Sequence, residues 1–92
     1  MSAPQYALSY SAVALKQLKK MDLSVADTIT SKLEQLVVSD HPLQTAKSLQ
    51  GDLAGTYRYR IGNYRAIFKV DKDGTITLLT ILDIKHRKDI YK

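Results

Sequence analysis

The spacing of hydrophobic residues changes once along this chain, from every third or fourth residue to every second. In the first half, two runs have helical spacing: Ala12, Leu15 and Leu18, and then Val25, Ile29, Leu33, Leu36 and Val37. From about residue 56 onwards hydrophobic and polar residues alternate, which is typical of strands with one buried face. The pattern predicts helices followed by an antiparallel sheet, an α+β fold.

Capping residues indicate where the first elements begin and end. A short strand is expected over residues 5–10, and Ser11 is expected to cap a helix that runs to about residue 21. Ser24 and Asp27 have the spacing of a capping-box variant, so we expect them to open a second helix that ends near Ser39. The following residues, 43–55, have no clear pattern and are expected to form a connection.

Three strands are expected after this connection, over residues 56–61, 64–70 and 75–82. Gly62 and Asn63 suit a two-residue turn, and the sequence DKDG supplies a second one. The strands should form an antiparallel meander with the helical hairpin packed on one face, all within a single domain spanning residues 1–92. A basic tail, DIKHRKDIYK, is expected after the last strand.

Alternation divides the expected sheet into two unlike faces. The more hydrophobic face should meet the helices and carries Tyr57, Tyr59, Ile61, Tyr64, Ala66, Phe68 and Val70, joined by Leu79 and Ile81. The other face mixes cations with hydrophobic residues: Arg58, Arg60, Arg65 and Lys69 beside Ile67, Ile76, Leu78 and Leu82. Such a mixture has little use in a monomer but suits a surface that binds an anion and a partner segment.

Composition narrows the class of protein and of partner. The 92 residues include 14 Lys and Arg against 9 Asp and Glu, which gives a formal charge of +5 and a pI of about 9.5. This balance favours polyanionic partners. The absence of cysteine excludes disulfides and thiolate sites. No membrane span, metal site or cofactor site is expected, and a cytoplasmic location is the default.

The arginines raise a question about the hairpin YRYRIGNYRAIFKV. With a turn at Gly62 and Asn63, Arg60 lies opposite Arg65, and like charges in that position destabilise a sheet. A solvated face paired with nearby acids explains this about as well as a functional site does. The tail shifts the balance, because Lys85, His86, Arg87, Lys88 and Tyr91 follow the last strand closely. A basic cluster with an aromatic residue that stacks on a base is typical of single-stranded RNA binding.

The segments KSLQG, YRYRIGNYRAIFKV, ITLLTI and KHRKDIY, in this order, resemble the RelE/ParE superfamily of bacterial and archaeal type II toxins, and most closely its RelE branch. The resemblance covers nearly the whole chain. It implies a toxin that enters the ribosomal A site and cleaves mRNA there, neutralised by a cognate antitoxin. The family pattern places the site at Arg58, Arg60, Arg65, Lys85 and Tyr91.

The RNA chemistry implied by the resemblance distributes roles among these residues. Arg60 and Arg65 would stabilise the phosphate in the transition state, Tyr91 would stack on a base, and Lys85 or His86 would protonate the leaving oxygen. Arg87, Lys88 and Lys69 are expected to contribute to RNA binding. Arginine is a poor general base, so either His86 removes the 2′-hydroxyl proton or the reaction relies on positioning and electrostatics.

Two other functions remain open from the sequence, and one partner is expected. A ParE-like toxin would poison DNA gyrase without cleaving RNA, and an RNA-binding module would bind without catalysis. The expected partners are mRNA, the ribosome and a RelB-like antitoxin, acidic and partly disordered. Ile67, Ile76 and Leu78 are expected to bind its amphipathic segment beside the arginines.

Overall fold

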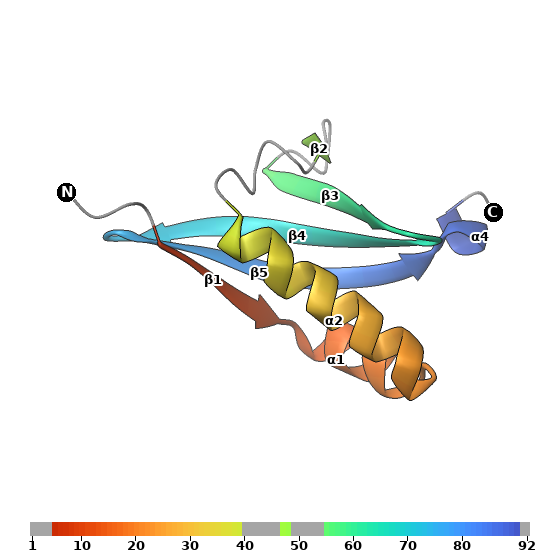
Figure 1. The fold of residues 1–92 in the computed structure, drawn as a ribbon. Helices are drawn as coiled ribbons and strands as arrows, with labels where there is room; N and C mark the ends of the chain where they lie inside the picture. Colours follow the sequence, from red (N-terminus) through yellow and green to blue (C-terminus); the bar gives the residue numbers. More distant parts are fainter. Residues whose placement is uncertain (1–4, 40–46, 49–54, 91–92) are drawn as a thin grey trace.

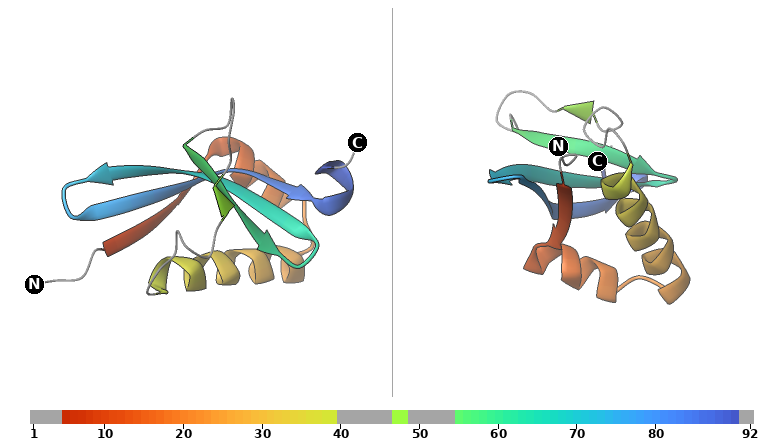
Figure 2. Two further views of the ribbon diagram at one scale, coloured as in Figure 1. Left: turned by 90° about the horizontal axis from the view of Figure 1, so that it is seen from above. Right: turned by 60° about the vertical axis from the view of Figure 1, so that its left-hand side comes forward.

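The computed structural model describes residues 5–39, 47–48 and 55–90. Both long helices lie on one side of a single sheet, as the sequence predicts (Figures 1 and 2). The elements in chain order are β1 (Gln5–Tyr10), α1 (Ala12–Lys19), α2 (Leu23–Val38), β2 (Lys47–Ser48), β3 (Thr56–Ile61), β4 (Tyr64–Asp73), β5 (Ile76–His86) and α4 (Arg87–Ile90).

The sheet has the strand order β1-β5-β4-β3-β2. The predicted meander of β3, β4 and β5 is confirmed, with antiparallel pairing throughout. β1 pairs parallel to β5, and the two-residue β2 extends the other edge beside β3. The sequence did not indicate β2, because two residues are too few to show an alternating pattern.

The helix starts agree with the sequence at α1 and differ at α2. The Ser11 side chain accepts a hydrogen bond from the Ala14 backbone N–H at 3.1 Å, as expected of an N-cap. The prediction that a capping box of Ser24 and Asp27 opens the second helix is wrong, because α2 begins at Leu23 and its N-cap is Asp22. The Asp22 carbonyl already accepts from the Ala26 N–H at 2.9 Å, which places Ser24 inside the first turn.

Both hairpins turn on two residues that begin with a glycine. Gly62 has a φ of 58°, and in the described part of the chain only glycines have a positive φ. A turn whose first central residue is a glycine with positive φ and whose second has negative φ fits type II′. The sequence placed the second turn at DKDG, but β4 continues to Asp73, so that Gly74 and Thr75 make the turn. Pairing continues because Asp71, Lys72 and Asp73 all have partners on β5.

The expected basic tail is mostly regular structure. β5 runs to His86 rather than to residue 82, because Ala66, Arg65 and Tyr64 on β4 supply partners for Ile84, Lys85 and His86. The chain then forms α4, and the Arg87 N–H donates to the carbonyl of Asn63 in the first hairpin turn at 2.7 Å. α4 is therefore anchored at the end of the sheet where β3 and β4 are joined (Figure 1).

The core lies between the helices and the face of the sheet predicted to be hydrophobic. Its largest fully buried side chains are Phe68, Ile29, Leu33, Leu79 and Ile81. Tyr57 stacks on Phe68 with ring centroids 5.5 Å apart. The helical stripe of α2 is confirmed, with Ile29, Leu33 and Leu36 buried and Val25 and Val37 packed against them. In the described part of the chain, no helix combines the length and hydrophobicity needed to cross a bilayer.

Candidate functional site

A β-bulge in β5 decides which side chains share the basic face. Phe68 pairs with Ile81, but the preceding residue Ile67 pairs with Asp83, so Leu82 is the extra residue. Before the bulge, Leu79 and Ile81 face the core, and after it Ile84 does so, with 3% of its surface exposed. Without this shift of one residue, Lys85 would have pointed toward the core. The bulge turns Asp83 and Lys85 onto the face of the arginines.

Three cations consequently lie side by side across three neighbouring strands. Arg60 on β3 pairs with Arg65 on β4, which pairs with Lys85 on β5. Neighbouring strands are about 4.8 Å apart, so this basic row spans about 10 Å at the backbone. Arg60 and Lys85 are exposed and Arg65 is half-buried. The register predicted for Arg60 and Arg65 is confirmed. Lys85 lies beside them, but within β5 rather than in a tail that folds back.

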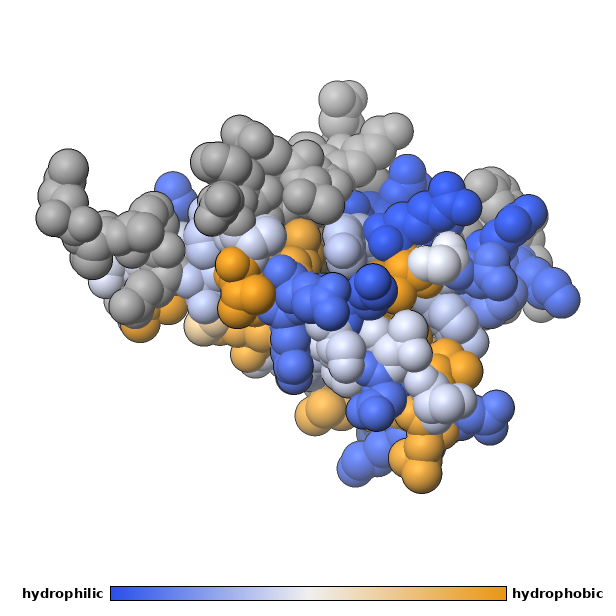
Figure 3. Space-filling model, in the orientation of Figure 1, coloured by the Kyte–Doolittle hydropathy of each residue, from blue (hydrophilic) through white to orange (hydrophobic). Residues whose placement is uncertain are grey.

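The arginines have few polar partners in the structure. Arg60 Nε donates weakly to the Gly62 carbonyl at 3.4 Å. Among the described residues, neither Arg58 nor Arg65 has an ion pair or a side-chain hydrogen bond. Arg58 lies one step behind the basic row, where it pairs with Ile67. Hydrophilic side chains gather at the end of the sheet near α4 (Figure 3). This concentration of positive charge suits a phosphate group.

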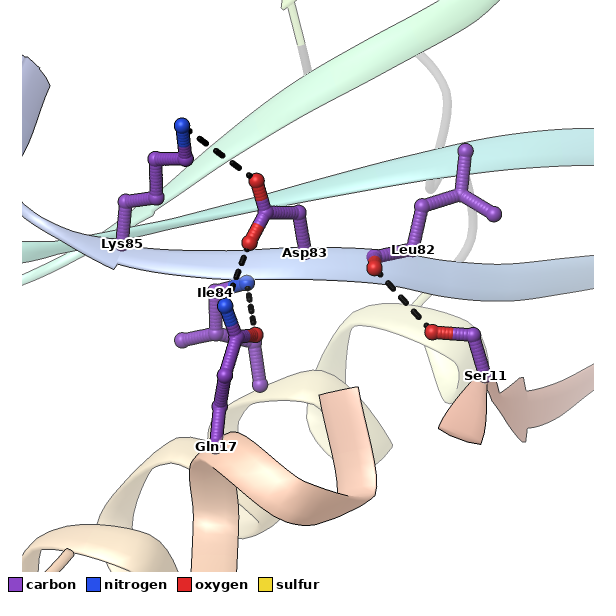
Figure 4. Close-up of polar contacts among 6 residues, drawn as sticks. All are labelled: Ser11, Gln17, Leu82, Asp83, Ile84 and Lys85. Atoms are coloured by element: carbon purple, nitrogen blue, oxygen red, sulfur yellow. Dashed lines mark hydrogen bonds and ion pairs between the residues drawn. The ribbon is translucent and has the colours of Figure 1, made fainter. Parts of the chain in front are cut away.

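Among the side chains that the structure describes, one carboxylate reaches the basic row. Asp83 Oδ2 lies 3.6 Å from Lys85 Nζ, and its Oδ1 accepts a hydrogen bond from Gln17 Nε2 at 2.5 Å (Figure 4). The Gln17 side-chain oxygen accepts from the Ile84 N–H at 2.7 Å. Asp83 therefore connects helix α1 to a cation of the site.

His86 lies apart from the basic row. It pairs with Tyr64, whose ring it meets edge-on at a centroid distance of 4.9 Å, on the opposite face from Lys85. His86 Nδ1 accepts a hydrogen bond from the Lys88 N–H at 3.1 Å. The structure therefore does not bring His86 together with the arginines, because neighbouring residues of a strand point to opposite faces.

The remaining expected site residues are spread along the molecule. Arg87 and Lys88 are exposed on α4, next to the basic row, whereas Tyr91 lies outside the described residues. Lys69 lies on β4, away from the basic row, and its Nζ is 3.7 Å from Asp71 Oδ2. Ile67 lies between Arg58 and Asp83, but Leu78 and Ile76 pair with Asp71 and Asp73 toward the far end of β4. The expected hydrophobic contacts therefore form an elongated surface rather than a cluster.

A hollow of about 280 Å³ lies on the helix side of the sheet. Its lining comes from the start of α2 and the first hairpin turn: Ser24, Val25, Thr28, Ile29, Ile61, Gly62, Asn63 and Tyr64. The lining residues that the structure describes are uncharged and do not include those of the basic row. No group of three or more His, Asp or Glu side chains with the arrangement of a metal site occurs in the described part of the chain.

Sequence reasoning missed Gln17 and Asp83 at this site. A signal was present in β5, where Leu79 and Ile81 keep an interval of two and the next buried residue, Ile84, follows after three. That change of phase indicates a bulge. Nothing in the sequence of α1 indicates the contact of Gln17, which depends on how the helix packs against β5.

Comparisons with known proteins agree on one superfamily. The family model of the ParE toxin of type II toxin–antitoxin systems, parDE, matches residues 8–91. The toxin RelG of Mycobacterium tuberculosis is 40% identical over 55 residues, and the match spans 60% of this chain but only 61% of the length of RelG.

Two solved complexes have the same fold. The toxin–antitoxin complex RelBE2 of Mycobacterium tuberculosis contains a chain that is 26% identical, with a TM-score of 0.68 and coverage of 94% of this chain and 95% of the other. A chain of the intact Escherichia coli RelBE toxin–antitoxin complex is 17% identical, with a TM-score of 0.64 and coverage of 88% and 95%. With the family match over residues 8–91, these findings show that the chain belongs to the RelE/ParE superfamily of type II toxins.

Proposed function

We propose that this toxin is a ribosome-dependent endoribonuclease that cleaves mRNA in the A site. The observation that carries the proposal is the basic row of Arg60, Arg65 and Lys85, flanked by Arg58. Like charges side by side destabilise a sheet, so the row needs a compensating use. A scissile phosphate is an anion of suitable size and charge, and it approaches the row from the face that the helices leave uncovered.

The basic row suits cleavage by the RNA's own 2′-hydroxyl. In this reaction the 2′-hydroxyl loses its proton to a solvent water molecule as its oxygen forms a bond to the neighbouring phosphorus. The bond from phosphorus to the 5′-oxygen breaks, and that oxygen takes a proton from Lys85. Arg60 and Arg65 stabilise the charge that develops on the phosphate oxygens, because guanidinium groups stay protonated and match their geometry. Arg58 holds the flanking phosphates together with Arg87 and Lys88 of α4. Lys69, further along β4, contributes to binding of the RNA strand.

Lys85 is the proton donor to the leaving 5′-oxygen in this proposal. It lies in the basic row, whereas His86 contacts Tyr64 on the other face. Tyr91 is assigned to base stacking from the family pattern. Positioning and electrostatic stabilisation then supply most of the rate enhancement.

Cleavage on programmed ribosomes tests the assignment. Arg65→Ala is expected to lower kcat by about 10² to 10³, the usual cost of losing one stabilising donor. Lys32→Ala, which removes an exposed cation from α2, should cleave at the wild-type rate. Equal rates for Arg65→Ala and wild type would refute the role of Arg65, and an inactive wild type would refute the proposed function.

Inhibition of DNA gyrase is the second candidate function, because the family model that matches is that of ParE. A gyrase inhibitor would block supercoiling in a purified assay and leave ribosome-bound mRNA intact. The two assays, run on one preparation, separate the candidates. The basic row favours RNA, since a toxin that only binds a protein has no evident need for it.

The partner proposed for this toxin is an acidic, partly disordered, RelB-like antitoxin. Both of the solved structures described above are toxin–antitoxin complexes. An amphipathic segment lying along β4 and β5 would contact Ile76, Leu78 and Ile67 and place its carboxylates near the arginines. Co-expression with the neighbouring gene product should give a stable complex, weakened by Ile76→Asp. Failure to associate would refute the partner. A ribosomal target implies a cytoplasmic location.

A further inference from the structure

Ser11, the N-cap of α1, and Gln17 within α1 both bind β5 at its bulge. Ser11 Oγ donates to the carbonyl of Leu82, the extra residue, at 3.0 Å, while Gln17 contacts the next two residues (Figure 4). Gln17 Nε2 donates to Asp83, and Gln17 Oε1 accepts from the Ile84 N–H.

Gln17 uses both ends of its amide group, and each end has a separate consequence. The Ile84 N–H is one of the backbone donors beside the bulge, so binding it fixes the chain path that turns Lys85 outward. The bond to Asp83 fixes a carboxylate whose other oxygen faces Lys85 Nζ. A glutamate at this position could accept from Ile84 but could not donate to Asp83.

Lys85 needs such a restraint because its neighbour in the basic row is a cation. Arg65 is its cross-strand partner, and repulsion between two like charges drives a long, flexible side chain into solvent. Asp83 opposes this repulsion from the same strand and the same face. Its own rotamer is in turn restrained by Gln17, whose side chain is half-buried between α1 and β5.

We infer that Gln17 is a positioning residue for the proposed RNA site: it acts through Asp83 and the bulge to hold Lys85 in the basic row. The inference rests on the proposed function, in which Lys85 protonates the leaving oxygen. Gln17 itself lies beneath the site and is not a catalytic residue. Small displacements of a catalytic group lower a rate strongly, so loss of the contact should appear mainly in kcat.

Three substitutions separate the two contacts of Gln17. Gln17→Met keeps the length of the side chain and removes both contacts. Gln17→Glu keeps the acceptor for the Ile84 N–H and replaces the donor to Asp83 by a like charge. Asp83→Asn keeps an acceptor for Gln17 and removes the charge that faces Lys85. Gln35→Ala is the matched control, because Gln35 is an exposed glutamine of α2 with no side-chain hydrogen bond among the described residues.

Cleavage kinetics on programmed ribosomes provide the first readout. We expect Gln17→Glu, Gln17→Met and Asp83→Asn to lower kcat about tenfold or more with KM nearly unchanged, and Gln35→Ala to match wild type. In a Lys85→Ala background, Gln17→Glu should cause no further loss, because its effect passes through Lys85. Wild-type kcat for Gln17→Glu, or an equal loss in both backgrounds, would overturn the inference.

Amide hydrogen exchange at Ile84 gives a second readout that needs no activity. Exchange should be at least tenfold faster in Gln17→Met than in wild type and nearly unchanged in Gln17→Glu. If wild type leaves mRNA intact, the proposed function fails and the positioning role fails with it, whatever the exchange shows. If wild type cleaves and the Gln17 variants cleave equally well, only the positioning role fails.

Discussion

Arg60 and Arg65 illustrate a conflict between folding and binding at the scale of single residues. Their backbones are direct partners, and in the described part of the chain no carboxylate pairs with either side chain. The two charges repel each other, and a phosphate bound between them would offset that repulsion. In the free toxin, repulsion between Arg60 and Arg65 is therefore expected to lower the free energy of unfolding.

Replacing Arg60 by threonine tests this conflict. Arg60→Thr should raise the free energy of unfolding by about 0.5 kcal/mol at low salt, and the gain should shrink as salt screens the repulsion. Urea denaturation at two ionic strengths measures both effects. Lys72→Thr is the control, because Lys72 has the neutral Thr77 as its partner on the adjacent strand. Equal gains in the two variants would show that β propensity, not repulsion, is responsible.

Tyr10 carries a second local cost. Its hydroxyl is buried and has no hydrogen-bond partner among the residues that the structure describes. Burial, with a smaller contribution from the negative charge of Glu34, raises the pKa of Tyr10 above its ordinary value of 10.0. The folded state thus holds this proton more tightly than the unfolded chain does. The part of the free energy of unfolding that depends on this proton is fully present below pH 10.0. It is lost as the pH rises through the pKa of Tyr10 in the folded state.

Tyr10→Phe should therefore act differently in neutral and in alkaline solution. At pH 7 we expect the variant to be more stable by about 1 kcal/mol, because a buried donor without a partner is removed. Above pH 10 the free energy of unfolding should fall more steeply for wild type than for Tyr10→Phe. Urea titrations between pH 7 and pH 11 measure both, and parallel curves would contradict the assignment.

At the scale of elements, Ser11 joins the start of α1 to the bulge of β5. Its hydroxyl oxygen accepts from the Ala14 N–H and its proton goes to the Leu82 carbonyl. One side chain thus satisfies an orphan donor of the helix and a carbonyl of the residue left unpaired by the bulge. The helix can rotate little without disturbing β5.

Ser11→Ala removes both hydrogen bonds and should lower the free energy of unfolding by about 1 to 2 kcal/mol. Ser24→Ala is the matched control, since Ser24 lies within α2 and does not cap it. That variant should be neutral or slightly stabilising, because alanine favours helices. Thermal or urea unfolding of both proteins decides the matter. A comparable loss of unfolding free energy in Ser24→Ala would show that Ser24 caps α2, as the sequence predicted.

The elements that the sequence predicted are those determined by local pattern. The meander, the Arg60–Arg65 register and the stripe of α2 follow from spacing and from the glycine of the first turn. The bulge at Leu82, the parallel pairing of β1 and the contact of Gln17 depend on packing between distant segments. Their residues have ordinary local preferences, so a reading of neighbouring positions could not place Asp83 beside Lys85.

At the scale of the whole molecule, stability depends on a small core. Phe68 is fully buried at its centre and stacks on Tyr57. Domains of this size are commonly stable by only about 5 to 15 kcal/mol, so one large cavity removes much of the margin.

Phe68→Ala should lower the free energy of unfolding by about 3 to 5 kcal/mol. Val38→Ala should change it by less than about 0.5 kcal/mol, because Val38 is 81% exposed at the end of α2. Urea denaturation followed by circular dichroism compares the two. A loss below about 1 kcal/mol in Phe68→Ala would show that the core does not centre on this residue.

The pairing of β1 with β5 also affects when the fold can be completed during synthesis. Ser11 and Leu82, which are bonded to each other, are 71 residues apart in the chain. At the usual speed of translation this separation corresponds to about 4 to 14 s. Throughout that interval β1 lacks its neighbour, Lys85 does not yet exist, and the basic row is incomplete. The late position of β5 in the chain thus delays completion of the basic row until nearly the whole chain has been made.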